Sequence, residues 1–216
     1  MQSPQSSTEG LKAVPWPVWA IFVLCLIPEL FFTGSDLGLW ATPRTRMVGF
    51  DYLGFWAGLL ADWQPNFALQ PWLMFFTYGF LHGGAVHFLV NMSTLFSLGT
   101  PVARSVGSRD FLLLYAILLV AGGLGFALFP ETSAPMVGAS GALFGLAGIV
   151  LSWDFQRRRR LRQTLLPTVQ SLAMLAGLNL VLWWAMNGQL AWQTHLGGFV
   201  AGWIAAYIVQ PYHRRP

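Results

Sequence analysis

Six apolar segments follow one another along this chain, and each approaches the length of a membrane crossing. They are residues 16–33, 84–103, 111–129, 138–153, 168–186 and 191–210, of which the fourth is short. A helix needs roughly 20 apolar residues to cross the hydrocarbon core of a bilayer. We therefore predict an all-α membrane protein built as a bundle of six transmembrane helices.

Charged side chains are too rare for a soluble domain. They make up 9% of the 216 residues, whereas soluble domains have about 25%. The length suits one domain, so we expect a six-helix domain over residues 16–210 with short tails, 1–15 and 211–216, the first of them disordered. Cys25 is the only cysteine, which excludes an intrachain disulfide and a cysteine metal site. We expect it to pack as a small hydrophobe.

The connection between the first two apolar segments, residues 34–83, is unusually long. It is rich in Trp, Phe and Pro, yet it contains the charged residues Asp36, Arg44, Arg46, Asp51 and Asp62. A structureless loop of this length would be uncommon in a compact domain. We expect instead an aromatic, partly helical element that lies in the membrane interface.

The basic residues predict the orientation, because cytoplasmic connections carry most of the Lys and Arg. With a cytoplasmic N-terminus, ten of the twelve fall on the inner side: Lys12, Arg104, Arg109, Arg157, Arg158, Arg159, Arg160, Arg162, Arg214 and Arg215. Both termini are therefore expected in the cytoplasm. The arginine run would contact lipid headgroups, so the net charge of +4 does not require nucleic acid. The short tails and the arginine bias favour a bacterial inner membrane, with an organelle membrane as the alternative.

Four polar side chains are expected in one layer of the membrane. At 1.5 Å per residue, Ser140, His195 and Asn91 lie roughly 20–24 Å from the cytoplasmic ends of their helices, and His87 lies about one turn further out. In a core about 30 Å thick, this layer is roughly 5–10 Å below the outer surface. An imidazole at such a depth is costly, and polar residues there are functional candidates by default.

Ser140 and His195 together indicate nucleophilic catalysis within the bilayer, with the serine as nucleophile and the histidine as base. His87 and Asn91 are four residues apart, so they share one helix face and can both donate hydrogen bonds. With the backbone N–H of Ser140 at the start of its helix, they would surround the position of an oxyanion. The alternative for His87 and Asn91 is a polar clasp between helices.

Two GxxxG pairs predict close approach of the fourth and sixth helices, although such spacing often indicates packing alone. The pairs are Gly141 with Gly145 and Gly198 with Gly202. Their contact would bring Ser140 Oγ within bonding range of His195. No carboxylate lies in this layer, which favours a dyad over a triad. Phe144, on the face of Ser140, is expected either to stack on the imidazole or to pack against lipid and helices.

Two further polar residues have structural interpretations. We expect Glu29, near the outer end of the first span, to reach the surface or to bond to the long outer loop, with a proton-carrying site as the alternative. Asn179 in the fifth span is expected to join helices by a hydrogen bond. A small transporter using His87, Asn91 and Glu29 is a further alternative, but no internal repeat supports it.

Three motifs of this chain resemble those of the rhomboid intramembrane serine proteases. They are Gly138-Ala139-Ser140-Gly141 followed by Phe144, His82-x4-His87-x3-Asn91, and His195-x2-Gly198-x3-Gly202. The likeness extends over the six-span core and its long outer first loop. It implies Ser140 as nucleophile, His195 as general base, an oxyanion hole from His87, Asn91 and the backbone N–H of Ser140, Phe144 stacked on His195, and His82 supporting the first loop.

The resemblance implies an intramembrane serine endopeptidase that cleaves transmembrane segments of other proteins near the extracytoplasmic face, without a metal or organic cofactor. The chain departs from the family in the first loop, where many members have a Trp-Arg pair and this chain has Leu73 and Met74. The internal support of that loop is therefore unassigned. The alternative is an inactive rhomboid-like protein that binds membrane helices and guides their trafficking, although such relatives usually lack the serine or the histidine.

Overall fold

The structure is a computed structural model, and it describes residues 13–129 and 134–211. Within these residues the chain is helical apart from loops and one isolated antiparallel bridge between Phe55 and Met136. The prediction of an all-α protein is confirmed. Of the two predicted tails, only residues 13–15 and Pro211 are described, and the remaining residues of both lie outside the described part of the chain.

The long helices correspond to the predicted apolar segments, and short helices fill the first connection. The long helices are α1 (Trp16–Asp36), α6 (Ser108–Ala127), α7 (Ser140–Arg160), α8 (Leu166–Ala185) and α9 (Trp192–Ile208). A further rod consists of α4 (Ala85–Thr94), the π-helical turn η3 (Leu95–Gly99) and α5 (Thr100–Val106). The first connection contains α2 (Thr45–Leu53), η1 (Ala57–Leu60), α3 (Gln70–Thr77) and η2 (Tyr78–Phe80). The predicted helical content of this loop is therefore confirmed.

Four stretches of helix are long and apolar enough to cross a membrane: α1, the rod Ala85–Val106, α6 and α8. Two predicted spans are not among them. The helix α9 has 17 residues, and α7, although 21 residues long, ends in four arginines that shorten its apolar part. Length and composition therefore indicate an integral membrane protein with four clear spans among the described residues.

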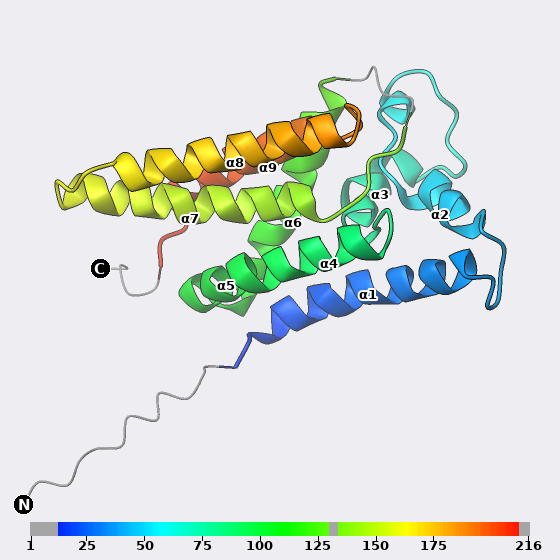
Figure 1. The fold of residues 1–216 in the computed structure, drawn as a ribbon, viewed down its shortest axis with the longest axis horizontal. Helices are drawn as coiled ribbons and strands as arrows, with labels where there is room; N and C mark the ends of the chain where they lie inside the picture. Colours follow the sequence, from blue (N-terminus) through cyan, green and yellow to red (C-terminus); the bar gives the residue numbers. More distant parts are fainter. Residues whose placement is uncertain (1–12, 130–133, 212–216) are drawn as a thin grey trace, which may run out of the picture.

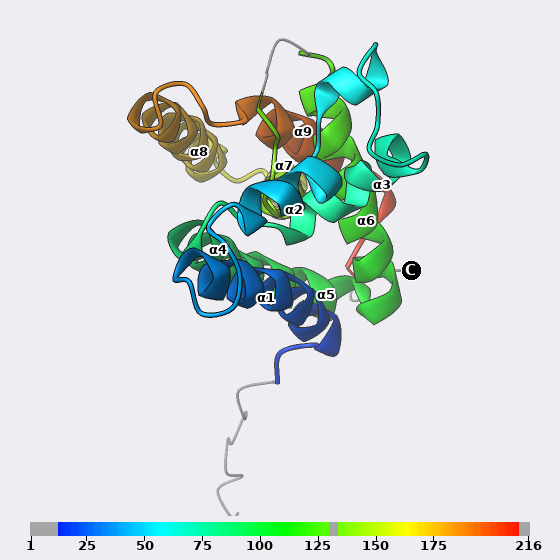
Figure 2. The ribbon, with the colours of Figure 1, turned by 90° about the vertical axis from the view of Figure 1, so that its right-hand side faces the viewer.

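The helices α7 and α9 form the tightest pair of the bundle. Figure 1 shows α1, α4, α7 and α8 running along a common direction, with α6 inclined behind them. A Cβ atom added at Gly198 would meet the carbonyl oxygen of Gly141, and one added at Gly202 would meet that of Gly145. The two GxxxG pairs thus face each other, which confirms the predicted close approach of these helices. Figure 2 looks along the helices and shows α8 at the edge of the molecule.

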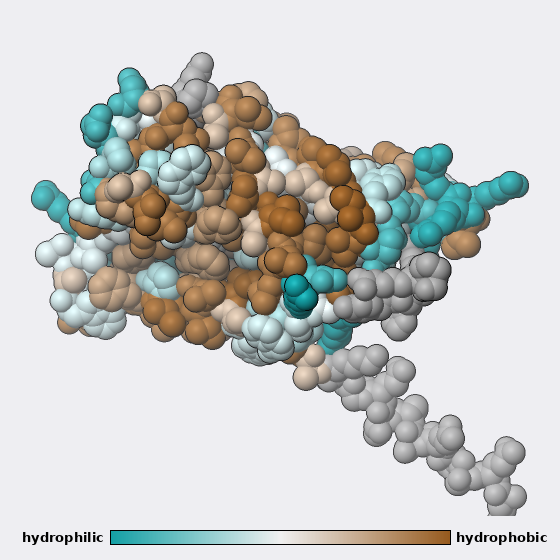
Figure 3. Space-filling model, turned by 180° about the vertical axis from the view of Figure 1, so that it is seen from behind, coloured by the Kyte–Doolittle hydropathy of each residue, from teal (hydrophilic) through white to brown (hydrophobic). Residues whose placement is uncertain are grey.

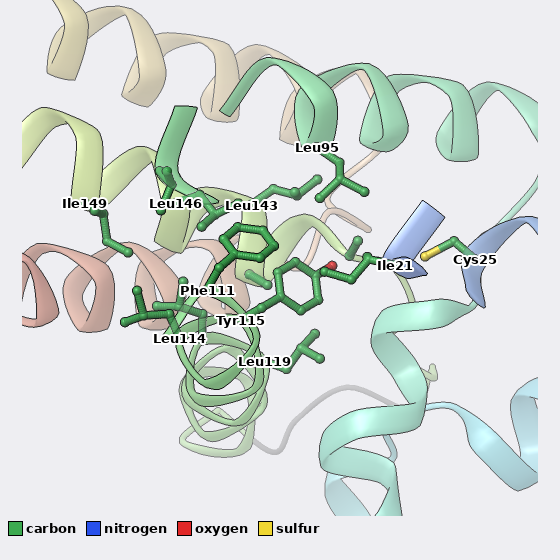
Figure 4. Close-up of a cluster of buried hydrophobic side chains, with 14 of the residues drawn as sticks. Ile21, Cys25, Leu95, Phe111, Leu114, Tyr115, Leu119, Leu143, Leu146 and Ile149 are labelled. Carbon is green, nitrogen blue, oxygen red and sulfur yellow. The ribbon is translucent and has the colours of Figure 1, made fainter. Parts of the chain in front are cut away.

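Large apolar side chains fill the space between α6, α7, α1 and η3. Figure 4 shows Phe111, Leu114, Tyr115 and Leu119 of α6, Leu143, Leu146 and Ile149 of α7, Leu95 of η3, and Ile21 and Cys25 of α1. In a membrane, such packing stabilises mainly through van der Waals contacts, because lipid is as apolar as the core. Cys25 is a free, fully buried thiol in this core, as predicted.

Arg46 of α2 holds the first loop against the bundle. Its guanidinium donates to Glu29 of α1 (Nη1–Oε2 2.9 Å) and to Asp36 (Nε–Oδ2 2.7 Å). It also donates to the backbone carbonyl oxygen of His82, at 2.7 Å. Burial alone would lower the pKa of Arg46, but the hydrogen bonds to Glu29 and Asp36 outweigh it and raise the pKa. Arg46 therefore supplies the missing loop support, and the predicted bond between Glu29 and the loop is confirmed.

Hydrophilic residues gather at the end of the molecule where α7 turns into α8, beyond a broad apolar surface (Figure 3). In this turn, the carboxylate of Asp154 accepts hydrogen bonds from Arg157 at 2.8 Å and from Arg158 at 2.6 Å. Asp154 also accepts from Thr168 Oγ1 at 2.8 Å. The start of α8 is thereby fastened to the arginine-rich end of α7.

Candidate active site

Ser140 and His195 are in direct contact. Ser140 is the first residue of α7 and His195 lies in the first turn of α9. Ser140 Oγ lies 2.8 Å from Nε2 of His195, within the range of an O–H···N hydrogen bond. The serine is half-buried, whereas His195 is 5% exposed. The close packing of α7 on α9 thus brings a partly accessible hydroxyl onto an enclosed imidazole.

Phe144 covers the face of the imidazole. The rings of Phe144 and His195 are parallel, with an interplanar angle of 1° and centroids 4.1 Å apart. Phe144 reaches the histidine because it lies one helical turn after Ser140, on the same face of α7. Of the two alternatives stated for Phe144, the stack is the one observed. It fixes the plane in which the ring nitrogens lie.

The turn that leads into α7 depends on Gly138. Its φ of 121° lies in a region that glycine enters without strain. A Cβ atom here would come within 2.8 Å of Cε1 and Nε2 of His87. Two residues earlier, Met136 pairs with Phe55 of the first loop through two backbone hydrogen bonds of 2.9 Å. The first loop and α4 therefore both contact the segment that positions Ser140.

His87 and Asn91 both belong to α4 and lie one helical turn apart. His87 Nδ1 accepts the backbone N–H of Gly83 at 3.2 Å, so in the neutral ring the proton resides on Nε2, which lies against Gly138. The buried Asn91 donates one amide hydrogen to the carbonyl oxygen of His87 at 2.9 Å, which leaves its second amide hydrogen. Among the described contacts, neither side chain is hydrogen-bonded to Ser140.

The ring of His82 packs against the ring of His87. Its ring meets those of His87 and Phe88 edge-on, at centroid distances of 5.1 and 5.5 Å. The side chain is 1% exposed, and among the described residues neither ring nitrogen has a hydrogen-bond partner. Burial, together with the nearby His87 and Arg46, lowers the pKa of His82 from 6.5 to about 3. His82 is therefore neutral, and its link to the first loop is its backbone carbonyl oxygen.

Asn179 of α8 is a site residue whose contact the sequence analysis did not identify. Its Oδ1 lies 2.6 Å from Nδ1 of His195, so it does bond between helices, but to the imidazole itself. The depth estimate used for the other polar residues could have indicated that Asn179 lies near their layer, but not which side chain it contacts. Counted from Thr168, Asn179 lies roughly 17 Å along α8, close to the depth of Ser140 and His195.

The groups assembled here are a hydroxyl, imidazoles and amides. Among the residues that the structure describes, no group of three or more His, Cys, Asp or Glu side chains is placed to hold a metal ion. A hydroxyl bonded to an imidazole can act as an activated nucleophile. Nearby N–H donors can stabilise the negative charge that develops on an attacked carbonyl. The chemistry available to this set is acyl transfer.

A family model and several known proteins that match this chain all point to the same family. The Rhomboid domain model matches residues 69–212, which include every candidate site residue above. The chain is 29% identical over 161 residues to the "Putative rhomboid protease YdcA" of Bacillus subtilis, covering 74% of this chain and 79% of that protein.

Two longer proteins are also similar to this chain. It is 35% identical over 134 residues to "RHOMBOID-like protein 4" of Arabidopsis thaliana, covering 60% of this chain and 32% of the relative. It is 32% identical over 139 residues to "Rhomboid protease GluP" of Bacillus subtilis, covering 64% and 26%. The match to these two relatives therefore covers only about a third and a quarter of their lengths.

Proposed function

We propose that this chain, which belongs to the rhomboid family, is an intramembrane serine endopeptidase with Ser140 as nucleophile and His195 as general base. The observation that carries the proposal is the 2.8 Å contact between Ser140 Oγ and His195 Nε2. It occurs under the stacked ring of Phe144, on a chain whose relatives include proteins named as rhomboid proteases.

The proposal includes six membrane crossings within a domain of residues 16–210, with α7 and α9 added to the four clear spans. The glycines of α7 and α9 let these two helices pack closely on each other. They therefore face lipid less than α8 does and need less apolar surface. The arginine-rich turn after α7 and the two tails would face the cytoplasm, in a bacterial inner membrane. The site would then open toward the extracytoplasmic side.

In the first chemical step, Ser140 Oγ attacks the carbonyl carbon of the scissile peptide bond while its proton passes to Nε2 of His195. The carbonyl oxygen becomes an oxyanion. The backbone N–H of Ser140, Nε2–H of His87 and the second amide hydrogen of Asn91 would donate to it. The ring of His87 lies against Gly138, two residues before α7, and the helix dipole at the start of α7 also favours negative charge.

Collapse of the tetrahedral intermediate breaks the C–N bond, and His195 gives its proton to the leaving amine. An ester between Ser140 and the carbonyl half of the substrate remains. Water then attacks this ester, with His195 as base, and the proton returns to Ser140 as the acid product leaves. Water must reach the site for this step, which the partial exposure of Ser140 supports. No metal or organic cofactor enters the scheme.

The substrate would be a transmembrane segment of another protein, unwound near the cut, because the peptide bonds of an intact helix are shielded from attack. Such a segment has to approach between helices. The helix α8 is the most lightly packed span, with 6% of its most apolar stretch buried in protein. Its displacement from the bundle edge would admit a substrate, as the family resemblance suggests.

The test uses the full chain reconstituted in liposomes with a panel of single-span proteins, with any cut mapped by mass spectrometry. Ser140→Ala should lower cleavage by at least about 1,000-fold. Ser97→Ala is the matched control, because that exposed hydroxyl bonds only to its own helix. A fluorophosphonate should label the wild type and the control but not Ser140→Ala. Cleavage by Ser140→Ala at the wild-type rate would refute the assignment, and a chain that neither cleaves nor labels would support the inactive alternative.

The oxyanion role of Asn91 is tested separately. Asn91→Ala removes the donor together with the bond to the carbonyl oxygen of His87. Loss of one oxyanion donor should lower turnover by about 100-fold, with a much smaller loss of thermal stability. Parallel losses of turnover and stability would favour the polar clasp.

A further inference from the structure

The imidazole of His195 is hydrogen-bonded at both nitrogens, from two different helices. Nε2 meets Ser140 Oγ of α7 at 2.8 Å, and Nδ1 meets Asn179 Oδ1 of α8 at 2.6 Å. His195 itself belongs to α9, so three helices meet at one ring. The side chain is almost fully enclosed, which strengthens both bonds relative to bonds in water.

The two bonds imply a particular tautomer. A base that takes a proton from Ser140 must present a lone pair at Nε2, so the single proton of the neutral ring must reside on Nδ1. That proton needs an acceptor, and the amide oxygen of Asn179 is placed to be one. The opposite amide orientation would donate to Nδ1 and leave Nε2 as a donor toward Ser140, which cannot function as a base.

We propose that Asn179 is a positioning residue for catalysis: it holds His195 in the Nδ1–H tautomer with Nε2 directed at Ser140, and it supports the imidazolium once the proton has moved. The inference rests on the proposed protease function and adds a third member to the expected dyad. A neutral amide suits this position because a carboxylate in the membrane would carry a far larger desolvation cost.

Phe144 cannot fulfil the same role. A parallel stack fixes the plane of the imidazole. A 180° rotation about the Cβ–Cγ bond of His195 keeps this plane and the stack, but it exchanges Nδ1 with Cδ2 and Nε2 with Cε1. Only directional partners at the edges distinguish Nδ1 and Nε2 from the ring carbons. The bond from Asn179 therefore supplies an orientation that the stack leaves open.

The helix α8 has few contacts with the rest of the protein, so the bond between Asn179 and His195 is a large part of its attachment near the site. Most side chains of α8 face outward, and Thr168 is its only buried residue. Among the described contacts, two side-chain hydrogen bonds join α8 to other helices. Thr168 bonds to Asp154 at the cytoplasmic end, and Asn179 bonds to His195 near the site. The position of α8 therefore determines whether the base keeps its acceptor, and a displacement of α8 that admits a substrate has to be reversed before His195 acts as base.

The first experiment reads the tautomer directly and does not depend on any substrate. The full chain is prepared with ¹⁵N-labelled histidine, and the His195 signals are assigned by their absence from His195→Gln. We expect protonated Nδ1 and unprotonated Nε2 in the wild type. In Asn179→Leu, which has a similar volume and no acceptor, we expect the proton to move to Nε2, where Ser140 Oγ can accept it. An unchanged tautomer in Asn179→Leu would overturn the proposal.

The second experiment measures cleavage as a function of pH. Asn179→Leu should lower kcat by about 10- to 100-fold with little change in KM, because part of the general-base contribution is lost. Asn179→Asp retains an acceptor and should recover activity at high pH. The acidic limb of its pH profile should move to higher pH, because a carboxylate stabilises the imidazolium. A purely structural role would not move that limb.

Ser171→Ala is the matched control, since it removes a polar side chain that bonds only within α8; its kcat and pH profile should equal those of the wild type. If Asn179→Leu fails to fold, the pH profile of Asn179→Asp decides, and an unshifted limb overturns the proposal. If the wild type cleaves and Asn179→Leu cleaves equally well, this inference fails while the protease function stands. If no variant cleaves but the tautomer depends on Asn179, the protease function fails instead.

Discussion

Gly138 is the residue of the site with the least freedom to change. Its positive φ is a backbone conformation that other residues adopt only with strain. In addition, the side of its Cα that would carry a Cβ lies against the ring of His87. Both constraints act two residues before Ser140. A side chain here would therefore alter the turn, the donor and the nucleophile together.

We expect Gly138→Ala to lower turnover by about 100-fold, because it displaces a candidate oxyanion donor and reorients the start of α7. The measurement is cleavage of a mapped substrate in liposomes. Gly177→Ala provides the comparison, since a Cβ there meets no other atom and the helix gains stability from alanine. Equal activity of the two variants would show that the turn does not depend on glycine.

The ring of His82 is buried, and neither of its nitrogens has a hydrogen-bond partner among the described residues. Its folded pKa of about 3 lies below the ordinary value of 6.5. Between these values the unfolded chain binds a proton that the folded chain does not. The free energy of unfolding should therefore fall as the pH falls from 6.5, by about 1.4 kcal/mol per unit for this residue.

His82→Phe should remove that dependence, because the ring lies among other rings and its nitrogens have no bond to lose. At pH 7 we expect stability equal to or above that of the wild type. Between pH 7 and pH 5 the variant should lose roughly 2 kcal/mol less than the wild type. Thermal unfolding in detergent at a series of pH values measures this difference, and parallel curves would contradict it.

Single residues also show how far the sequence could predict the site. Periodicity and depth identified Ser140, His195 and Phe144 as neighbours, because helix geometry converts spacing into position. The contact of Asn179 with His195 depends on the register between α8 and α9. No sequence pattern specified that register.

Among the helical elements, α2 is joined to α1 by a buried ion pair. The side chain of Arg46 is 11% exposed and that of Glu29 is 4% exposed, at an Nη1–Oε2 distance of 2.9 Å. Removing one partner of a buried pair leaves the other charge uncompensated, which typically costs about 3–5 kcal/mol. The first loop should therefore depend on Arg46 for its position.

We expect Arg46→Met to lower the free energy of unfolding by about 3 kcal/mol or more, and the double variant Arg46→Met/Glu29→Met to recover much of that loss. Chemical unfolding in detergent provides the measurement. Arg44→Met is the control, because Arg44 is exposed at the start of α2 and has no ion pair in the described structure. A double variant as unstable as Arg46→Met would show that the loss does not arise from an isolated charge.

The elements differ in how well their sequences predict them. The clear spans α1, α6 and α8 and the rod Ala85–Val106 follow from apolar length, because a bilayer imposes that length directly. The short helices of the first loop could be expected only as a class. Their bounds depend on tertiary contacts such as the bridge between Phe55 and Met136, which joins residues far apart in the chain.

At the scale of the whole molecule, the arginine cluster and the candidate active site lie at opposite ends of α7. Ser140 begins this helix, and Arg157 to Arg160 form its last turn. If the arginines face the cytoplasm, the candidate site faces the other side of the membrane. The orientation of the whole bundle can therefore be determined from two exposed positions.

We expect Asp62→Cys in the first loop to react with an impermeant maleimide added to intact cells, and Gln163→Cys in the α7–α8 turn to react only after the membrane is opened. Both positions are exposed, and the native Cys25 is fully buried, so background labelling should be low. The unmodified chain serves as the control for that background. The reverse pattern of labelling would contradict a cytoplasmic arginine turn.

The outward-facing surface of α8 has a consequence for how the protein responds to its membrane. Where protein contacts are few, acyl chains become the main neighbours of this helix, and their length influences its tilt. Through its contact with Nδ1 of His195, Asn179 would transmit a change of that tilt to the proposed base. Lipids of different thickness should then alter the reaction rate of an unmodified chain, so that the bilayer itself acts as an effector of catalysis.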